Sequence, residues 1–160
     1  MPTYTDSLGF NKGSASYPDK GRLDITKLAV ELDFAAITAA RAAAGATALT
    51  SGDVLEVLQI PAGTQVLAVG LNVTTAEGGT LTVDVGDGDD PDGYLDGVNG
   101  NAVAGYSSSQ VTISEGAPNT LSPALPWGKY YASADTIDVK TVNAADAAVM
   151  TVWALVVDCN

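Results

Sequence analysis

Apolar and polar residues alternate with a period of two along most of the chain beyond Asp53. Such alternation is typical of β-strands, and it predicts strands over residues 54–60, 67–73, 80–85, 127–132, 136–142 and 148–158, with shorter candidates over 101–107 and 110–114. The turn residues Glu77-Gly78-Gly79 predict that strands 67–73 and 80–85 form a hairpin. Turn residues recur at the regular, short spacings that are typical of β-sandwiches. We therefore expect a mainly β protein with an antiparallel, jelly-roll-like β-sandwich.

An Ala-rich stretch interrupts this pattern after a further predicted strand over residues 23–32. Asp33 is placed to cap a helix, and Gly45 follows the last helical position. The residues expected on the packed face of this helix are Phe34, Ile37, Ala40 and Ala44. The sequence therefore predicts one short helix with little side-chain area, which must pack closely on something to be stable.

The last predicted strand, residues 148–158, is apolar on both faces. One face carries Val149, Thr151, Trp153, Leu155 and Val157, and the other carries Met150, Val152, Ala154 and Val156. A central strand has one face in the core, and the second face then needs the Ala-rich helix, the N-terminal segment or another subunit to cover it. If it is a subunit interface, its candidate residues are Met150, Val152 and Val156.

Residues 1–22 follow neither the helix nor the strand period and are rich in Gly, Ser, Pro and Asp. We therefore divide the chain into an extended N-terminal arm, residues 1–22, and a β-sandwich domain, residues 23–160. Tyr4, Phe10 and Tyr17 are spaced along the arm and need a surface to lie on. That surface belongs either to the arm's own domain or to a neighbouring subunit, and a third alternative is that the arm is disordered.

The chain has 7 Lys and Arg against 19 Asp and Glu, a formal net charge of −12. The first 41 residues are balanced, so the imbalance lies in the rest of the chain. This charge argues against nucleic acid and anionic membranes as partners. The first twenty residues hold no signal-like apolar run, and no stretch of about eighteen apolar residues occurs, so we expect a soluble protein made in the cytoplasm.

The sequence contains few residues of the types that commonly carry out catalysis. The chain has no His, and its one cysteine, Cys159, has no partner for an internal disulfide, so we expect no enzyme and no cofactor. The dense acidic group is Asp84, Asp87, Asp89, Asp90, Asp92 and Asp96. Its spacing does not match an EF-hand, so a solvated acidic loop is favoured over a cation site and no metal ligand is assigned. Within strand 80–85, Asp84 is expected to face outward.

Aromatic residues offer one alternative function. Tyr94 lies beside the acidic loop, and Trp127, Tyr130 and Tyr131 form a second aromatic group. Aromatic platforms beside carboxylates are typical of sugar sites. These residues therefore offer a carbohydrate- or receptor-binding module as a possible function.

Several segments resemble structural proteins of tailed-bacteriophage virions, particularly capsid decoration or cement proteins. They are the polar arm, the Ala-rich stretch 34–44, the segment Gly52-Asp53-Val54-Leu55-Glu56-Val57 with Pro61-Ala62-Gly63-Thr64, and the loop Val85-Gly86-Asp87-Gly88-Asp89-Asp90-Pro91-Asp92-Gly93-Tyr94. The resemblance implies a homotrimer on the outer surface of the virion capsid. It also implies binding to the major capsid protein across subunit boundaries, with the arm laid along the shell. The alternative within the same resemblance is the carbohydrate- or receptor-binding module, as part of a tail or head fibre.

The arm residues assigned to capsid binding on this basis are Tyr4, Phe10, Lys12, Tyr17, Lys20 and Arg22. The aromatic side chains would be the anchors, and the cations would pair with carboxylates of the shell.

Overall fold

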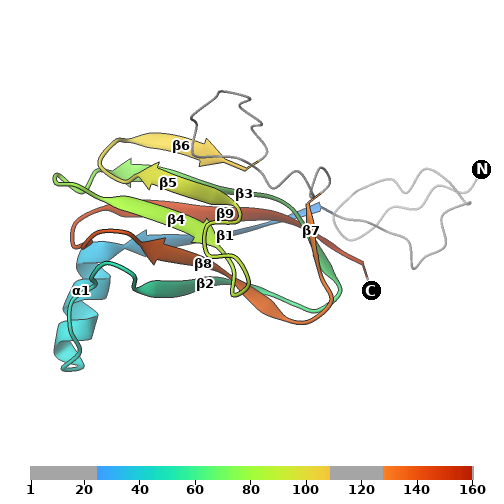
Figure 1. The fold of residues 1–160 in the computed structure, drawn as a ribbon, viewed down its shortest axis with the longest axis horizontal. Coiled ribbons are helices and arrows are strands. Elements are labelled where there is room, and N and C mark those ends of the chain that lie inside the picture. Colours follow the sequence, from blue (N-terminus) through green and yellow to red (C-terminus); the bar gives the residue numbers. More distant parts are fainter. Residues whose placement is uncertain (1–24, 109–127, 160) are drawn as a thin grey trace, which may run out of the picture.

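The computed structural model describes residues 25–108 and 128–159, which form two antiparallel β-sheets packed face to face (Figure 1). The strands are β1 (Ile25–Asp33), β2 (Val54–Ile60), β3 (Thr64–Thr75), β4 (Thr82–Gly86), β5 (Leu95–Asn99), β6 (Ala104–Ser107), β7 (Lys129–Tyr131), β8 (Asp135–Thr141) and β9 (Val149–Asp158). One sheet has the order β1-β9-β3-β6, with β7 also paired to β3. The other has the order β2-β8-β4-β5. The predicted mainly β, jelly-roll-like sandwich is confirmed.

The core lies between the two sheets. Its fully buried side chains include Leu71, Val83, Ile137 and Met150, which come from strands of both sheets. The two-faced strand β9 is central in its sheet, since it pairs with β1 on one side and with β3 on the other. This confirms the central position that its two apolar faces predicted.

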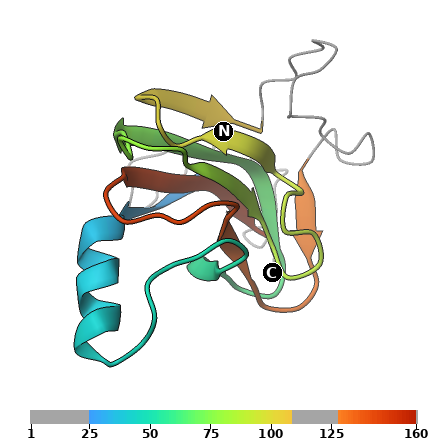
Figure 2. The ribbon, with the colours of Figure 1, turned by 60° about the vertical axis from the view of Figure 1, so that its left-hand side comes forward.

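The helix α1 (Phe34–Ala43) begins and ends where the sequence predicted. The Asp33 carboxylate accepts a hydrogen bond from the Ala36 amide at 3.0 Å, and Gly45 has a φ of 72° just beyond the last turn. Only Phe34 of the helix is buried, and Ala40 and Ala44, expected on the packed face, are exposed. The helix projects beyond the sandwich at one end (Figures 1 and 2), so close packing of this helix is not provided by its own sandwich.

The start of α1 is fixed by a contact that the sequence did not reveal. The Glu77 carboxylate accepts hydrogen bonds from the amides of Asp146, Ala147 and Ala148, at 2.8, 3.1 and 2.7 Å. Ala148 in turn accepts a hydrogen bond from the amide of Phe34 at 3.0 Å. The turn after β3 thereby holds the loop before β9, and that loop holds the first residue of the helix.

The predicted hairpin between strands 67–73 and 80–85 is wrong. These segments become β3 and β4, which belong to different sheets, and β4 pairs instead with β8 and β5. A turn signal reports only that the chain reverses, whereas the pairing partner is chosen by long-range contacts. The Glu77-Gly78-Gly79 turn therefore carries the chain from one sheet to the other.

Two further local predictions need correction. Strand β5 was missed, because Asp96 and Gly97 break the alternation and leave only Leu95 and Val98 buried. Leu67 was expected in the inward row of β3, but a bulge between Val66 and Ala68 shifts the pairing. An extra residue at a bulge moves the following side chains to the other face. The candidate strand 110–114 lies outside the described residues, and the candidate 101–107 is the shorter β6.

Candidate functional site

The arm residues assigned to capsid binding lie outside the described residues. These are Tyr4, Phe10, Lys12, Tyr17, Lys20 and Arg22. The described chain starts at Ile25, the first residue of β1 and therefore of an edge strand. The described element closest in sequence to these residues is therefore β1, whose sheet has one face toward the core and one face away from it.

That face carries an aromatic side chain held in a fixed position. Trp153 of β9 is opposite Ala29 of β1 and Gly70 of β3 in the sheet register. A Cβ atom on Gly70 would lie within 2.2 Å of the Trp153 ring, so a larger residue there requires the ring to move. The Lys27 ammonium lies 5.9 Å from the centre of the same ring, within the range of a cation–π contact.

Apolar residues surround this tryptophan. Leu155 is half-buried on the same face of β9, and Ile25 of β1 is 63% exposed. We call Ile25, Lys27, Ala29, Trp153 and Leu155 the outer sheet face. It combines an aromatic ring, aliphatic side chains and a cation on β1 and β9, so its chemistry suits contact with another polypeptide.

The three subunit-interface candidates lie on the opposite face of β9. Met150 and Val152 are 0% exposed and Val156 is 7% exposed, so all three contribute to the core of their own chain. Their burial corrects the expectation that these side chains are available at the surface. The alternation along β9 instead places Trp153 and Leu155 on the outside, and the sequence pattern does not by itself distinguish the two faces.

The acidic loop after β4 contains an ordered network between the sheets. Asp87 accepts hydrogen bonds from the Lys129 ammonium, at 2.6 Å, and from the Tyr131 hydroxyl. Because Tyr131 donates its only hydroxyl proton to Asp87, its oxygen accepts from the Tyr94 hydroxyl at 2.7 Å. We call Asp87, Tyr94, Lys129 and Tyr131 the inter-sheet network. It connects β7 of one sheet with both ends of the β4–β5 loop of the other.

Burial and hydrogen bonding act in opposite directions on these groups. Burial tends to raise the pKa of Asp87, but hydrogen bonds from Lys129 and Tyr131 outweigh it and leave the pKa below its ordinary value. Burial raises the pKa of both Tyr94 and Tyr131 well above the usual range. At neutral pH the network therefore consists of an ionised Asp87, a charged Lys129 and two neutral phenols.

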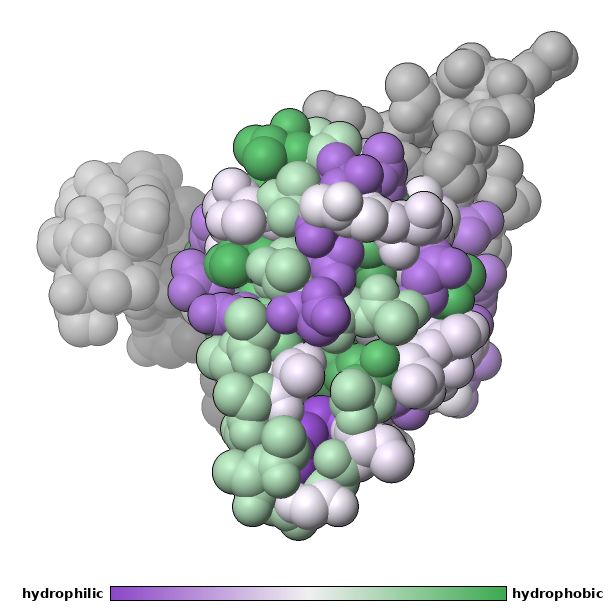
Figure 3. All heavy atoms as spheres, turned by 90° about the vertical axis from the view of Figure 1, so that its left-hand side faces the viewer, coloured by the Kyte–Doolittle hydropathy of each residue, from purple (hydrophilic) through white to green (hydrophobic). Residues whose placement is uncertain are grey.

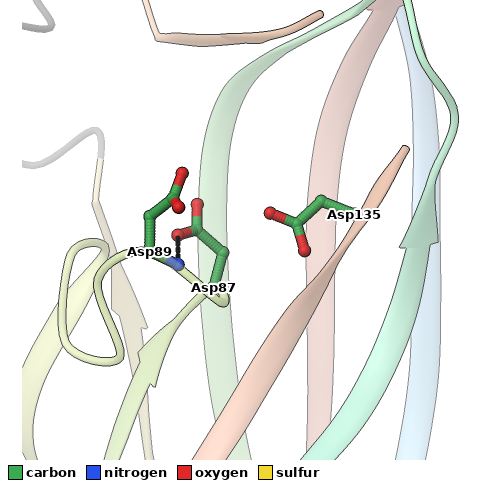
Figure 4. A group of neighbouring side chains, drawn as sticks. All are labelled: Asp87, Asp89 and Asp135. Carbon is green, nitrogen blue, oxygen red and sulfur yellow. Dashed lines mark hydrogen bonds between the residues drawn. The ribbon is translucent and has the colours of Figure 1, made fainter. Parts of the chain in front are cut away.

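The acidic loop also has the ligand types of a cation site. Carboxylate oxygens of Asp87, Asp89 and Asp135 lie within 4.8 Å of one another, from the loop after β4 and the start of β8 (Figure 4). The Lys129 ammonium is 2.6 Å from Asp87 and 3.3 Å from Asp89, so the chain supplies a cation of its own to the cluster. The contact with Lys129 gives Asp87 a structural role. The geometry of the three carboxylates does not identify a particular metal ion.

Asp84 has a structural role as well. It was expected to face solvent, but it is buried. Its carboxylate accepts from the Gly97 amide at 3.0 Å and lies 3.7 Å from the Lys140 ammonium. These partners compensate the cost of burying the charge.

The aromatic residues of the alternative function do not form a platform for a sugar. Tyr94 and Tyr131 are 8% and 4% exposed and bind each other, whereas Tyr130 is 56% exposed. Trp127 lies outside the described residues. A ring must be accessible to stack on a sugar, so among Tyr94, Tyr130 and Tyr131 only Tyr130 is placed to do so.

The fold was compared with known proteins. No protein-family model matches the chain, and no curated protein matches its sequence. Solved structures do match: the chain has the fold of chains found in bacteriophage capsids. In a capsid structure of Helicobacter pylori bacteriophage KHP30 the TM-score is 0.52 at 14% identity, over 85% of this chain and 89% of that chain.

Two further capsid structures agree with this likeness. A chain of the Ralstonia phage GP4 capsid aligns with a TM-score of 0.54 at 18% identity, over 84% of each chain. A chain of the cyanophage Pam1 capsid asymmetric unit aligns with a TM-score of 0.53 at 16% identity, over 98% of each chain. At these identities the likeness establishes the shared fold. Within residues 25–108 and 128–159, no helix has the length and apolarity needed to cross a membrane.

Proposed function

We propose that this chain is a non-enzymatic structural protein of a phage virion, which binds the outside of the capsid and stabilises it by bridging subunits of the major capsid protein. The observation that carries the proposal is the likeness of nearly the whole fold to chains of three phage capsid structures. The absence of His from the sequence, and the use of Asp87 and Asp89 to bind Lys129, agree with a role without catalysis.

Stabilisation follows from binding linkage. A protein that contacts two shell subunits at once binds only when those subunits are assembled, so its binding free energy adds to that of the assembled shell. In the proposed complex Tyr4, Phe10 and Tyr17 anchor the arm, and Lys12, Lys20 and Arg22 pair with carboxylates of the shell. A homotrimer would present three such arms, and linked arms raise one another's effective concentration.

The outer sheet face supports this orientation. The arm precedes β1 in the sequence, and in β1 Ile25 is exposed and Lys27 lies over Trp153. The same combination of aromatic, aliphatic and cationic side chains that the arm carries therefore continues onto the body. The remaining surface is strongly acidic, which disfavours attachment to the nucleic acid of the host or the phage.

Capsid loading tests this proposal. The full-length chain and a variant with Tyr4→Ser, Phe10→Ser and Tyr17→Ser are added to purified capsids that lack the protein, and bound chain is measured after sedimentation. We expect the wild type to load to saturation and the triple variant to lose most of its binding. Equal melting temperatures of the two free proteins are the control for folding. Full loading by the triple variant would contradict the role of the arm.

A further inference from the structure

Strand β1 forms an edge of its sheet that differs from the other described edges. It pairs with β9 alone, over nine residues and without a break in register. The pairing of β2 is irregular between Glu56 and Leu58, and β5, β6 and β7 have five residues or fewer. Proteins usually shorten or interrupt the edges that must stay unpaired, whereas a long, regular edge without proline readily pairs with another strand. Of the described edges, β1 is therefore the one suited to strand addition.

Most side chains of β1 are also accessible. The exposed residues are Ile25, Thr26, Lys27, Ala29 and Glu31, and Leu28 and Val30 are half-buried. Helix α1, which follows this strand, gives no comparable signal. Figure 3 looks at the end of the molecule where α1 lies, and hydrophilic and apolar residues are interspersed over it. The information about a partner is therefore in the order of residues along β1.

That order is complementary to itself in the antiparallel direction. When two copies of β1 pair with Ala29 opposite Ala29, Lys27 of each copy lies opposite Glu31 of the other. On the other face of the strand, Leu28 of each copy lies opposite Val30 of the other. Opposite charges and pairs of aliphatic side chains both stabilise cross-strand neighbours. Because the contact is two-fold, each of these pairs is made twice.

The two charges have no competing ion pair within residues 25–108 and 128–159. The ion pairs there join Lys129 and Lys140 to acids of β4 and of the loop that follows it. Lys27 lies over the Trp153 ring, and Glu31 is four residues farther along the strand, about 13 Å away. The two side chains are too far apart to pair within one chain, but a second copy in this register brings them together.

We propose that β1 is a self-association edge, at which two copies of this chain pair antiparallel about Ala29 and join their sheets. The contact is two-fold and so goes beyond the proposed homotrimer, whose chains are related by a three-fold axis. If the proposed function holds, it would join chains of neighbouring trimers on the shell. Trp153 is opposite Ala29 within each chain, so the outer sheet faces of the two copies become one continuous surface.

Disulfide formation tests this register in the full-length chain, without capsids. Cys159, the one cysteine, is replaced by Ser, and Ala29→Cys is added. The Cα atoms of directly opposite residues are about 4.5–5.5 Å apart, a separation that a disulfide can span. Ile25→Cys in the same background is the matched control, since Ile25 is exposed on the same face of β1 but about 26 Å along the strand from its own copy. Each protein is oxidised with diamide at about 50 µM and separated on a denaturing gel without reductant.

We expect Ala29→Cys to form a covalent dimer of twice the 16.2 kDa chain mass, about tenfold faster than Ile25→Cys. Adding Lys27→Glu or Glu31→Lys to Ala29→Cys places like charges opposite each other and should slow dimer formation about tenfold. Adding both exchanges together should restore the rate. Because the two residues do not meet within one chain, restoration can come only from pairing between copies.

Equal rates for Ala29→Cys and Ile25→Cys would overturn the proposal, as would a double exchange that fails to restore dimer formation. If Ala29→Cys does not dimerise, labelling of its thiol with a maleimide identifies the reason. Slow labelling would mean that another segment of the same chain covers β1, and fast labelling that the edge stays open in solution; either result overturns the proposal. Circular dichroism checks that each variant is folded. Because no capsid is present, these failures are distinct from failure of the loading experiment.

Discussion

Replacing Tyr131 by Phe removes one oxygen atom from the inter-sheet network and leaves the ring in place. The lost hydroxyl donates to the ionised Asp87 and accepts from Tyr94. A hydrogen bond to a charged group is worth about 1.5–3 kcal/mol, and a buried donor left without a partner costs about 1–3 kcal/mol. Asp87 keeps its contact with Lys129. We therefore expect Tyr131→Phe to lower the free energy of unfolding by about 2–4 kcal/mol.

Tyr94→Phe is the second variant needed to test the network. It removes a bond between two neutral groups, and the Tyr131 hydroxyl keeps Asp87 as its acceptor, so the expected cost is about 1 kcal/mol. In the Tyr131→Phe background the Tyr94 hydroxyl is the buried donor that has lost its partner, so its removal should restore part of the lost stability. Urea denaturation of the wild type, both single variants and the double variant gives the four free energies of a double-mutant cycle. Strictly additive costs would refute the proposed network.

The pH dependence of the stability of Tyr131→Phe provides a second check of the network. The pKa of Asp87 is lowered in the folded protein, so the stability from this group is present above the pKa of the unfolded chain. It is lost as the pH falls through the folded pKa. Tyr131→Phe removes one of the bonds that lower this pKa, so the difference between variant and wild type should shrink as the pH falls below about 4. A difference that is constant down to pH 2 would show that ionised Asp87 is not the acceptor.

Three other changes test single contacts. Gly70→Ala forces a methyl group against Trp153 and should cost about 1–3 kcal/mol by thermal melting, whereas Gly79→Ala, which meets open space, should change stability by less than about 0.5 kcal/mol. Glu77→Gln should cost about 1 kcal/mol at pH 7. The pKa of Glu77 is lowered because backbone hydrogen bonds outweigh burial, so the wild-type advantage over Glu77→Gln should disappear as the pH falls through that pKa. Asp33→Ala removes the cap of α1 and should cost about 1 kcal/mol, with a loss of helical circular dichroism.

Local sequence patterns were sufficient to predict most strands and the helix, because the signals for these elements lie within or beside the elements themselves. Alternation placed most strands, and the cap at Asp33 with Gly45 placed the helix to within a residue. Sheet partners were not predictable in the same way. The Glu77 turn has the composition of a hairpin, but its carboxylate binds amides of the loop before β9, which is far away in the sequence. The hairpin prediction failed because that contact is not encoded in the turn itself.

The candidate sites also could not be predicted from local sequence alone. The sequence showed that β9 has two apolar faces, but the choice of the outer one depends on Gly70, which leaves room for the Trp153 ring. Likewise, nothing near Asp87 distinguished it from the other acids of its loop. Its partners Lys129 and Tyr131 arrive from β7, after a long intervening segment. Both sites are defined by contacts between strands that are distant in the chain.

In the proposed function, capsid binding through the arm and self-association of the chain depend on each other. The three proposed anchors, Tyr4, Phe10 and Tyr17, lie in a segment whose sequence follows neither the helix nor the strand period. Ordering such a segment on the shell would have an entropic cost, which would keep the affinity of one arm modest. Linking binding modules raises the apparent affinity by a factor of about 10²–10⁴ without any new contact to the target. The proposed homotrimer would supply that link. Self-association of the chain would therefore convert three weak arms into stable attachment to the shell.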